Sequence, residues 1–344
     1  MKQERYDSLD LAKLILSFMV LMGHIPPPLS FQEVLLAICR LTIPLFFTIS
    51  GFLFFRKWPP VTAGSEERKK RLLHFLKRSA RLYFSWMILL MPITIKYWSW
   101  YGYSLQKSVL LFIMNIFLGE TFVNSWFLPA LMLGIAIIAV LSSRLSNRSL
   151  FIIALACYLV CCAFSSYGNL LQLPQPGSGE FNVKNSFLFS MVWLVIGKVI
   201  SENEETVLQK TRSHYLPLIL IGIAAAVLYG IEYSTCVTRS WASTTDQFVT
   251  EIPISTILFL LILSVKMRIQ HAKNIRTIST VTYCAHGSFG VVLRSVGKRF
   301  GIYFDIPSQW FLSYGLTLLF CVFLGLAIPR LSRLKHLHFL SWLC

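Results

Sequence analysis

The sequence predicts an all-α protein, a polytopic membrane helix bundle of about ten transmembrane helices, and three observations carry that prediction. Hydrophobic residues make up 55% of the 344 residues, and charged residues make up only 14%. The mean hydropathy of +0.63 is far too high for a soluble globular protein. Apolar windows of about 17 to 25 residues, the length that a helix needs to cross a bilayer, recur along the whole chain.

Ten such windows follow one another, separated by more polar segments. They are roughly residues 9–29, 32–55, 79–98, 126–142, 150–166, 186–200, 214–232, 250–265, 280–297 and 308–329. The window 280–297 carries polar residues throughout, so we expect it to pack inside the bundle. The apolar stretch 104–118 is short, and we expect an interfacial or re-entrant helix there.

The positive charges indicate how these helices are oriented. Lys and Arg in short loops accumulate on the cytoplasmic side of a membrane. Most of the 32 Lys and Arg lie in segments that are cytoplasmic when the N-terminus is inside, and ten spans then place both termini in the cytoplasm. This topology, together with anionic membrane lipids as partners, explains the net charge of +17 without nucleic acid. We expect a multi-pass protein of the inner, or cytoplasmic, cell membrane.

Residues 1–344 are expected to form one integral-membrane domain without a cleavable signal peptide or a fused soluble domain. The eight cysteines fall mostly within apolar runs and show no metal-ligand spacing. Buried free thiols are the expected state of these cysteines, and no metal is expected.

Lys13 and His24 lie on the first apolar window, and they are its most informative residues. Eleven helical steps rotate by about 1100° and rise by about 16 Å, so both side chains share one face at different depths. A cation and an imidazole are costly inside a membrane and usually mark a functional site. The topology places Lys13 toward the cytoplasm and His24 toward the outside.

Arg78 and Arg81 continue a basic run from the second cytoplasmic loop into the third window. Three residues apart, they are neighbours on one helix face. Paired guanidinium groups bind phosphate through several donors in one plane. The alternative is an anchor that binds lipid headgroups.

Five segments, in this order along almost the whole chain, resemble the acyltransferase-three family of membrane enzymes. The matching residues are Asp10, Lys13 and His24 in the first window, Pro44, Phe46, Phe47, Ser50 and Gly51 in the second, Arg78 and Arg81 in the third, Trp126 at the fourth, and Ser279, Tyr283 and His286 near the ninth. Lysine at position 13 departs from the commoner arginine of the family.

The resemblance implies an O-acyltransferase that moves an acyl group, often acetyl, from acyl-CoA to a hydroxyl of a cell-envelope sugar or polysaccharide. His24 is the expected general base, because histidine titrates near neutral pH. Asp10 and His286 are further catalytic candidates, although Asp10 is too far along the helix to touch His24. His286 has a structural role as its alternative.

Acetyl-CoA, or another acyl-CoA, is the expected co-substrate. Its phosphates would meet Lys13, Arg78 and Arg81 on the cytoplasmic side. Trp126, Tyr283 and Ser50 are candidates for binding the acceptor. Trp126 has membrane-interface anchoring as an alternative role, and Ser50 with Gly51 has close helix packing.

Two other functions remain open from the sequence. In a proton-coupled transporter or flippase of envelope precursors, Lys13 and His24 would form a relay for protons or ions. A catalytically inactive relative would keep the bundle as a scaffold and would not bind CoA.

Overall fold

The structure is a computed structural model, and it describes residues 6–28, 30–60, 64–99, 101–176, 180–304 and 309–344. These residues form helices and no strand, which confirms the predicted all-α class. The elements are α1 (Asp7–His24), α2 (Gln32–Arg40), α3 (Thr42–Phe55), α4 (Ser65–Ser99), α5 (Leu105–Leu118), α6 (Phe127–Leu141), α7 (Asn147–Phe164), the short 3-10 helix η2 (Val183–Asn185), α8 (Phe187–Glu202), α9 (Glu204–Ser213), α10 (Tyr215–Thr238), α11 (Glu251–Ser264), α12 (Ala272–Arg299), α13 (Trp310–Leu331) and the 3-10 helix η4 (Lys335–Leu343).

Each of the ten apolar windows overlaps one helix or the pair α2 and α3. The window ends at residues 29 and 308 lie outside the described residues. Among the described residues, four helical stretches are both long and apolar enough to cross a membrane: Gln32–Phe55, Asn147–Phe164, Tyr215–Thr238 and Trp310–Leu331. The number of crossings and the cytoplasmic location of both termini stay predictions.

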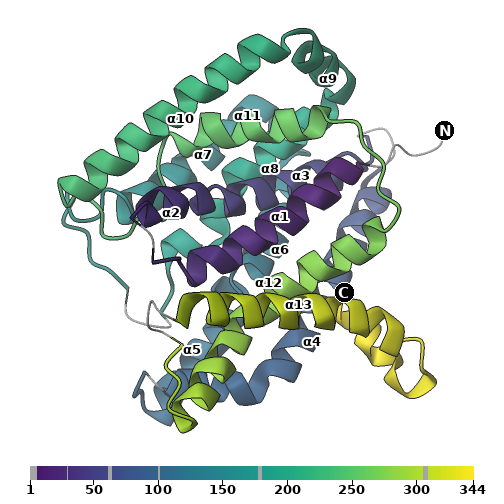
Figure 1. The fold of residues 1–344 in the computed structure, drawn as a ribbon. Coiled ribbons are helices and arrows are strands. Elements are labelled where there is room, and N and C mark those ends of the chain that lie inside the picture. Colours follow the sequence, from purple (N-terminus) through teal and green to yellow (C-terminus); the bar gives the residue numbers. More distant parts are fainter. Residues whose placement is uncertain (1–5, 29, 61–63, 100, 177–179, 305–308) are drawn as a thin grey trace.

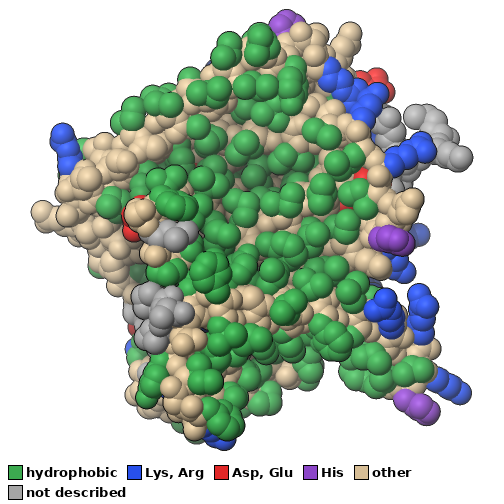
Figure 2. Space-filling view, in the orientation of Figure 1, with side chains coloured by type: hydrophobic (Ala, Val, Ile, Leu, Met, Phe, Trp, Pro, Cys, Tyr) green, Lys and Arg blue, Asp and Glu red, His purple; other side chains and the backbone are tan. Residues whose placement is uncertain are grey.

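The surface of the bundle has the character of a membrane protein. Helix α10 lies along the margin of the molecule (Figure 1), and its outer side chains are exposed and apolar, including Leu216, Leu220, Val227 and Ile231. Hydrophobic side chains cover the centre of the face in Figure 2, and Lys and Arg gather mostly on the side where α1 begins and α13 ends. This separation of charge is the one that a topology with the N-terminus inside predicts.

Helices α3 and α8 pack backbone against backbone through two glycines. A Cβ atom on Gly197 would lie 2.3 Å from the carbonyl oxygen of Thr48, and one on Gly51 would lie 2.7 Å from that of Leu194. The Ser50 hydroxyl donates to the Phe46 carbonyl of its own helix at 2.7 Å. Small residues allow such close approach between helices in a membrane. The contact joins the second halves of α3 and α8, and the starts of both helices lie beside a cavity.

Two expectations about unusual helices can be compared with the structure. Helix α12 buries polar side chains, including Thr282, His286 and Ser288, so the prediction that 280–297 packs inside the bundle is confirmed. Helix α5 covers nearly all of the stretch 104–118. The Tyr83 hydroxyl, near the middle of α4, lies 2.7 Å from the hydroxyl of Thr121 just after α5. The segment that follows α5 therefore contacts α4, and the expected interfacial or re-entrant helix stays a prediction.

Candidate functional site

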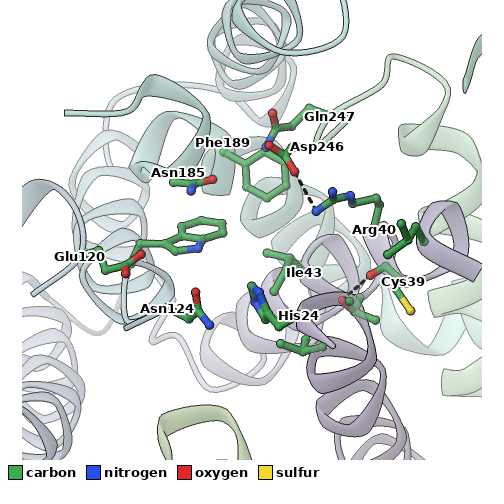
Figure 3. Close-up of a pocket in the computed structure, with 15 residues that line it drawn as sticks. His24, Cys39, Arg40, Ile43, Glu120, Asn124, Asn185, Phe189, Asp246 and Gln247 are labelled. Carbon is green, nitrogen blue, oxygen red and sulfur yellow. Dashed lines mark hydrogen bonds and ion pairs between the residues drawn. The ribbon is translucent and has the colours of Figure 1, made fainter. Parts of the chain in front are cut away.

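A cavity of about 150 Å³ lies at the end of the bundle where α1 stops. Its lining comes from the last turn of α1, the region where α2 and α3 meet, the start of α8, and the segments that precede α6, α8 and α11 (Figure 3). The polar side chains in this lining include His24, Arg40, Glu120, Asn124, Asp246 and Gln247. The side chains of these residues surround a shared space although they lie far apart in the sequence.

Local sequence signals stop the helices at this point. Residues 26–28 are three prolines, which prevent α1 from continuing beyond His24. Helices α2 and α3 are separated at Leu41, where the Thr42 hydroxyl donates to the Cys39 carbonyl at 2.6 Å. The Ser186 side chain caps the start of α8 by accepting from the backbone N–H of Leu188. Helices α3, α6 and α8 begin beside the cavity, and α1 and α2 end there, so helix ends of both dipole signs surround it.

Two histidines from different helices meet beside this cavity. The ring centroids of His24 and His286 are 5.2 Å apart, and the rings are tilted by 30°. His286 is buried, and both of its nitrogens are engaged: Nδ1 lies 2.9 Å from the carbonyls of Thr282 and Tyr283, and Nε2 lies 3.3 Å from Asn124 Nδ2. His24 is exposed to the cavity and makes no hydrogen bond to another described residue. Of the two rings, His24 is therefore the one available to a ligand.

The hydrogen bonds of His286 assign its protonation state. Two carbonyl oxygens at Nδ1 require a proton on that nitrogen, and the Asn124 amide then donates to the lone pair of Nε2. The ring is neutral with neither nitrogen free to accept a proton. The Tyr283 hydroxyl also donates to the Asn124 carbonyl at 2.9 Å. Helix α12 thus holds the segment before α6 in place.

Asn124 has a backbone φ of 64°, a conformation that Asn and Gly adopt more readily than Ala. Asn124→Gly removes only the amide that donates to His286, so we expect a loss of about 1 kcal/mol of stability. Asn124→Ala loses the same hydrogen bond and adds backbone strain, so we expect it to be less stable than the glycine variant by about a further 1 kcal/mol. Thermal unfolding in detergent measures the relative stabilities of the wild type and the two variants. An alanine variant as stable as the glycine variant would contradict this account.

A second cavity of about 230 Å³ adjoins the first. Glu120, Trp126 and Asn185 line both cavities, and Trp98 at the end of α4 and Tyr101 after it line the second. The expected topology places both of these aromatic residues on the external side. Trp126 packs against Phe47 and Phe189, with ring centroids 6.2 and 6.0 Å away. Trp126 thus lies in the wall that the two cavities share, and its predicted acceptor-binding role stays a prediction.

The other end of α1 carries two buried carboxylates, Asp7 and Asp10, and the cation Lys13. Arg276 Nε lies 3.6 Å from Asp10 Oδ2. Lys13 interacts electrostatically with Asp10, Arg276 and Arg78. The Ser279 hydroxyl donates to the Lys13 carbonyl at 2.9 Å and so joins α12 to α1 at this level. The cations Lys13, Arg78 and Arg276 thus share this end with the carboxylates of Asp7 and Asp10.

The structure divides the predicted site residues between these two ends. His24, His286, Tyr283 and Trp126 meet at the cavity, whereas Asp10, Lys13 and Arg78 meet at the basic end. Asp10 is thus not brought to His24, as its predicted catalytic role would require. The Arg81 guanidinium lies over the ring of Trp342 in η4, 6.0 Å from its centroid. Ser50 lies on α3, and it is not among the residues that line the cavity.

Sequence reasoning missed several members of both ends. Arg276 belongs to the basic end, and Asn124, Arg40 and Gln247 belong to the cavity. For Arg40 a signal existed, because it is a charged residue inside the apolar window 32–55. Gln247 and Asn124 lie in connecting segments, where no periodicity distinguishes a lining residue from a solvated one.

Comparison with known proteins adds the family context. The model of the acyltransferase domain of the acyltransferase-three family matches residues 6–326. A serine/alanine racemase of Enterococcus gallinarum is 25% identical over 239 residues, which are 65% of this chain and 33% of the relative. An amino-acid racemase of Enterococcus faecalis is 24% identical over 216 residues, 59% of this chain and 29% of the relative. The chain thus matches about a third of the length of these curated relatives. No solved structure matches the chain.

Proposed function

Because the chain belongs to the acyltransferase-three family of membrane acyltransferases, we propose that it moves an acyl group, acetyl in the simplest case, from acyl-CoA to a hydroxyl of a cell-envelope sugar or polysaccharide. The reaction would take place in the cytoplasmic membrane, where acyl-CoA on one side meets the acceptor on the other. The observation that carries the proposal is His24, whose ring faces a polar cavity at one end of α1, while Lys13 lies within electrostatic range of Asp10, Arg276 and Arg78 at the other end.

In the proposed reaction, His24 takes the proton of the acceptor hydroxyl as its oxygen attacks the thioester carbonyl. A tetrahedral intermediate forms, its carbon–sulfur bond breaks, and the CoA sulfur leaves with the proton returned by the imidazolium. The products are an ester and free CoA. The N-termini of α6 and α8, which begin beside the cavity, would contribute partial positive charge to the developing oxyanion.

The donor would bind with its phosphates at the basic end. Lys13, Arg78 and Arg276 offer three cations there, and Arg81 lies one turn from Arg78 on α4. CoA carries a 3′-phosphate and a pyrophosphate, which guanidinium groups bind through paired hydrogen bonds. The flexible arm of CoA would then carry the thioester along α1 toward His24, across the rise of about 16 Å between the two residues.

The direct test is acetyl transfer from labelled acetyl-CoA by protein in native membranes or nanodiscs. Arg78→Ala is expected to raise the KM for acetyl-CoA about tenfold, with a smaller change in kcat, because a charge-assisted contact to phosphate is lost. The matched control is Arg144→Ala, an exposed arginine between α6 and α7 on the same expected side. An Arg78→Ala enzyme with unchanged kinetic constants would remove the basic end from the mechanism.

A transporter is the second candidate, and one observation favours it. The helical stretch Gln32–Phe55 is interrupted beside the cavity, between α2 and α3, as happens at the substrate sites of many transporters. The names of the two relatives make serine and alanine the first solutes to test. Uptake into proteoliposomes without acyl-CoA, lost in His24→Ala, would favour transport over transfer.

A further inference from the structure

The second cavity has an acidic lining, although the protein as a whole is strongly basic. The chain has a net charge of +17, yet none of the described residues that line this cavity of about 230 Å³ is a Lys, Arg or His. Two carboxylates line it, those of Glu120 and Glu180, together with three asparagines: Asn115, Asn182 and Asn185. A cavity with this lining attracts cations and disfavours anions.

Glu120 is the carboxylate that the two cavities share. It lies between α5 and α6, and Figure 3 shows it on the side of the first cavity opposite Arg40. Its carboxylate accepts a hydrogen bond from the Asn124 backbone N–H and makes no ion pair with a described residue. The side chain is partly buried, and a carboxylate that is withdrawn from water is costly without a counter-charge.

The other carboxylate, that of Glu180, already holds an ammonium group of the chain itself. Lys107 Nζ lies 3.2 Å from Glu180 Oε1 and 3.9 Å from the centroid of the Tyr103 ring. A carboxylate and an aromatic face together therefore bind a cation at the edge of this cavity. Lys107 is not among the lining residues, and neither is Arg294, a cation within electrostatic range of Tyr97.

Much of the remaining wall of the second cavity is aromatic, contributed by Tyr97, Trp98, Tyr101 and Trp126. The centroid of the Tyr101 ring lies 5.3 Å from that of Tyr97 and 5.9 Å from that of Trp98. Aromatic rings attract organic cations through their negative faces. A neutral sugar also stacks on such rings, but it would leave the Glu120 carboxylate without a counter-charge. A metal ion is disfavoured, because no group of three or more His, Cys, Asp or Glu that could hold one occurs among the described residues.

We infer that the second cavity is a cation-binding subsite, which holds an ammonium group of the acceptor, primary or quaternary, between Glu120 and the aromatic wall. A hydroxyl of the same molecule would then lie in the first cavity, which Glu120 and His24 both line. The inference rests on the proposed acyl transfer and adds the charge of the acceptor to it. Amino sugars and glycans that carry choline or ethanolamine share this chemistry.

The test measures equilibrium binding of three labelled cations, choline, ethanolamine and glucosamine, to the protein in nanodiscs. Each cation has a neutral counterpart: neohexyl alcohol for choline, propanol for ethanolamine, and N-acetylglucosamine for glucosamine. At least one cation is expected to bind, and its neutral counterpart is expected to bind about tenfold more weakly. The cation that binds most tightly distinguishes a quaternary ammonium group from a primary one.

Variants of two lining residues make the result specific. Glu120→Gln keeps the size of the side chain and removes its charge, so it is expected to weaken binding of the cation about tenfold and to leave the neutral counterpart unchanged. Tyr101→Leu is expected to weaken the cation about fivefold, whereas Tyr101→Phe keeps the ring and should bind nearly as the wild type does. Glu205→Gln, at an exposed carboxylate on α9, is the matched control and should leave binding unchanged.

Three results would overturn the inference: none of the three cations binds, each neutral counterpart binds as tightly as its cation, or neither Glu120→Gln nor Tyr101→Leu weakens the bound cation. Acetyl-CoA binding is measured in parallel, because its expected site lies at the opposite end of α1. Wild-type protein that fails to bind acetyl-CoA would refute the proposed transfer itself. Intact acetyl-CoA binding without cation binding refutes only the subsite.

Discussion

His24→Ala is expected to lower acyl transfer by about 10²- to 10⁴-fold while the protein stays folded and binds acyl-CoA as before. The first part follows from the loss of a general base, which typically contributes a factor of this size. The second part follows from the position of the ring, which faces the cavity and makes no hydrogen bond to another described residue. Turnover at saturating acetyl-CoA measures the rate of acyl transfer, and a separate experiment measures the binding of acetyl-CoA.

Two histidine variants make this result specific. His214→Ala removes an exposed imidazole between α9 and α10 and is expected to leave turnover unchanged. His286→Gln removes the ring whose two nitrogens are engaged by α12 and Asn124, so it is expected to reduce stability together with turnover. If His24→Ala retained wild-type turnover, the catalytic base would have to be sought elsewhere. Such a result would leave the fold and the family intact.

The sequence predicted which segments form helices better than it predicted where those helices begin and end, and the reason is physical. An apolar window reports only the part of a helix that lipid requires to be apolar, so the window 79–98 missed the first turns of α4, which begins at Ser65. The break between α2 and α3 was also missed, because the window 32–55 is apolar on both sides of it. Two signals were present there, the charged Arg40 and Pro44 in the first turn of α3.

The sequence predicted the part of the candidate site that lies on α1, but not the residues that other helices bring to it. Helical geometry placed Lys13 and His24 on one face at different depths, and the structure gives them separate surroundings at the two ends of α1. What surrounds each of them comes from other helices and connecting segments. Asp10 illustrates the limit, since its partner Arg276 is distant in sequence and no local pattern links the two.

The contact between α3 and α8 gives the second large expected effect. Gly197→Ala is expected to destabilise the protein by about 3 kcal/mol or more, since overpacking of a well-packed contact costs at least this order when nothing can yield. The added Cβ would lie 2.3 Å from the Thr48 carbonyl oxygen and 2.6 Å from the Phe52 backbone nitrogen. Both neighbours are backbone atoms, so relief requires the two helices to move apart. Gly51→Ala, with a nearest distance of 2.7 Å to a backbone oxygen, should act in the same direction.

Separation of these helices would also open the cavity, because Thr42 and Ile43 at the start of α3 and Phe189 at the start of α8 line it. The yield of monodisperse protein and its thermal midpoint in detergent measure the effect. Gly230→Ala on α10 is the matched control: its Cβ would meet no atom within 4 Å, and alanine favours a helix, so its stability should equal or exceed that of the wild type. Equal stability of the Gly197 and Gly230 variants would mean that α3 and α8 do not pack this closely. Another contact would then have to hold Thr42, Ile43 and Phe189 in the wall of the cavity.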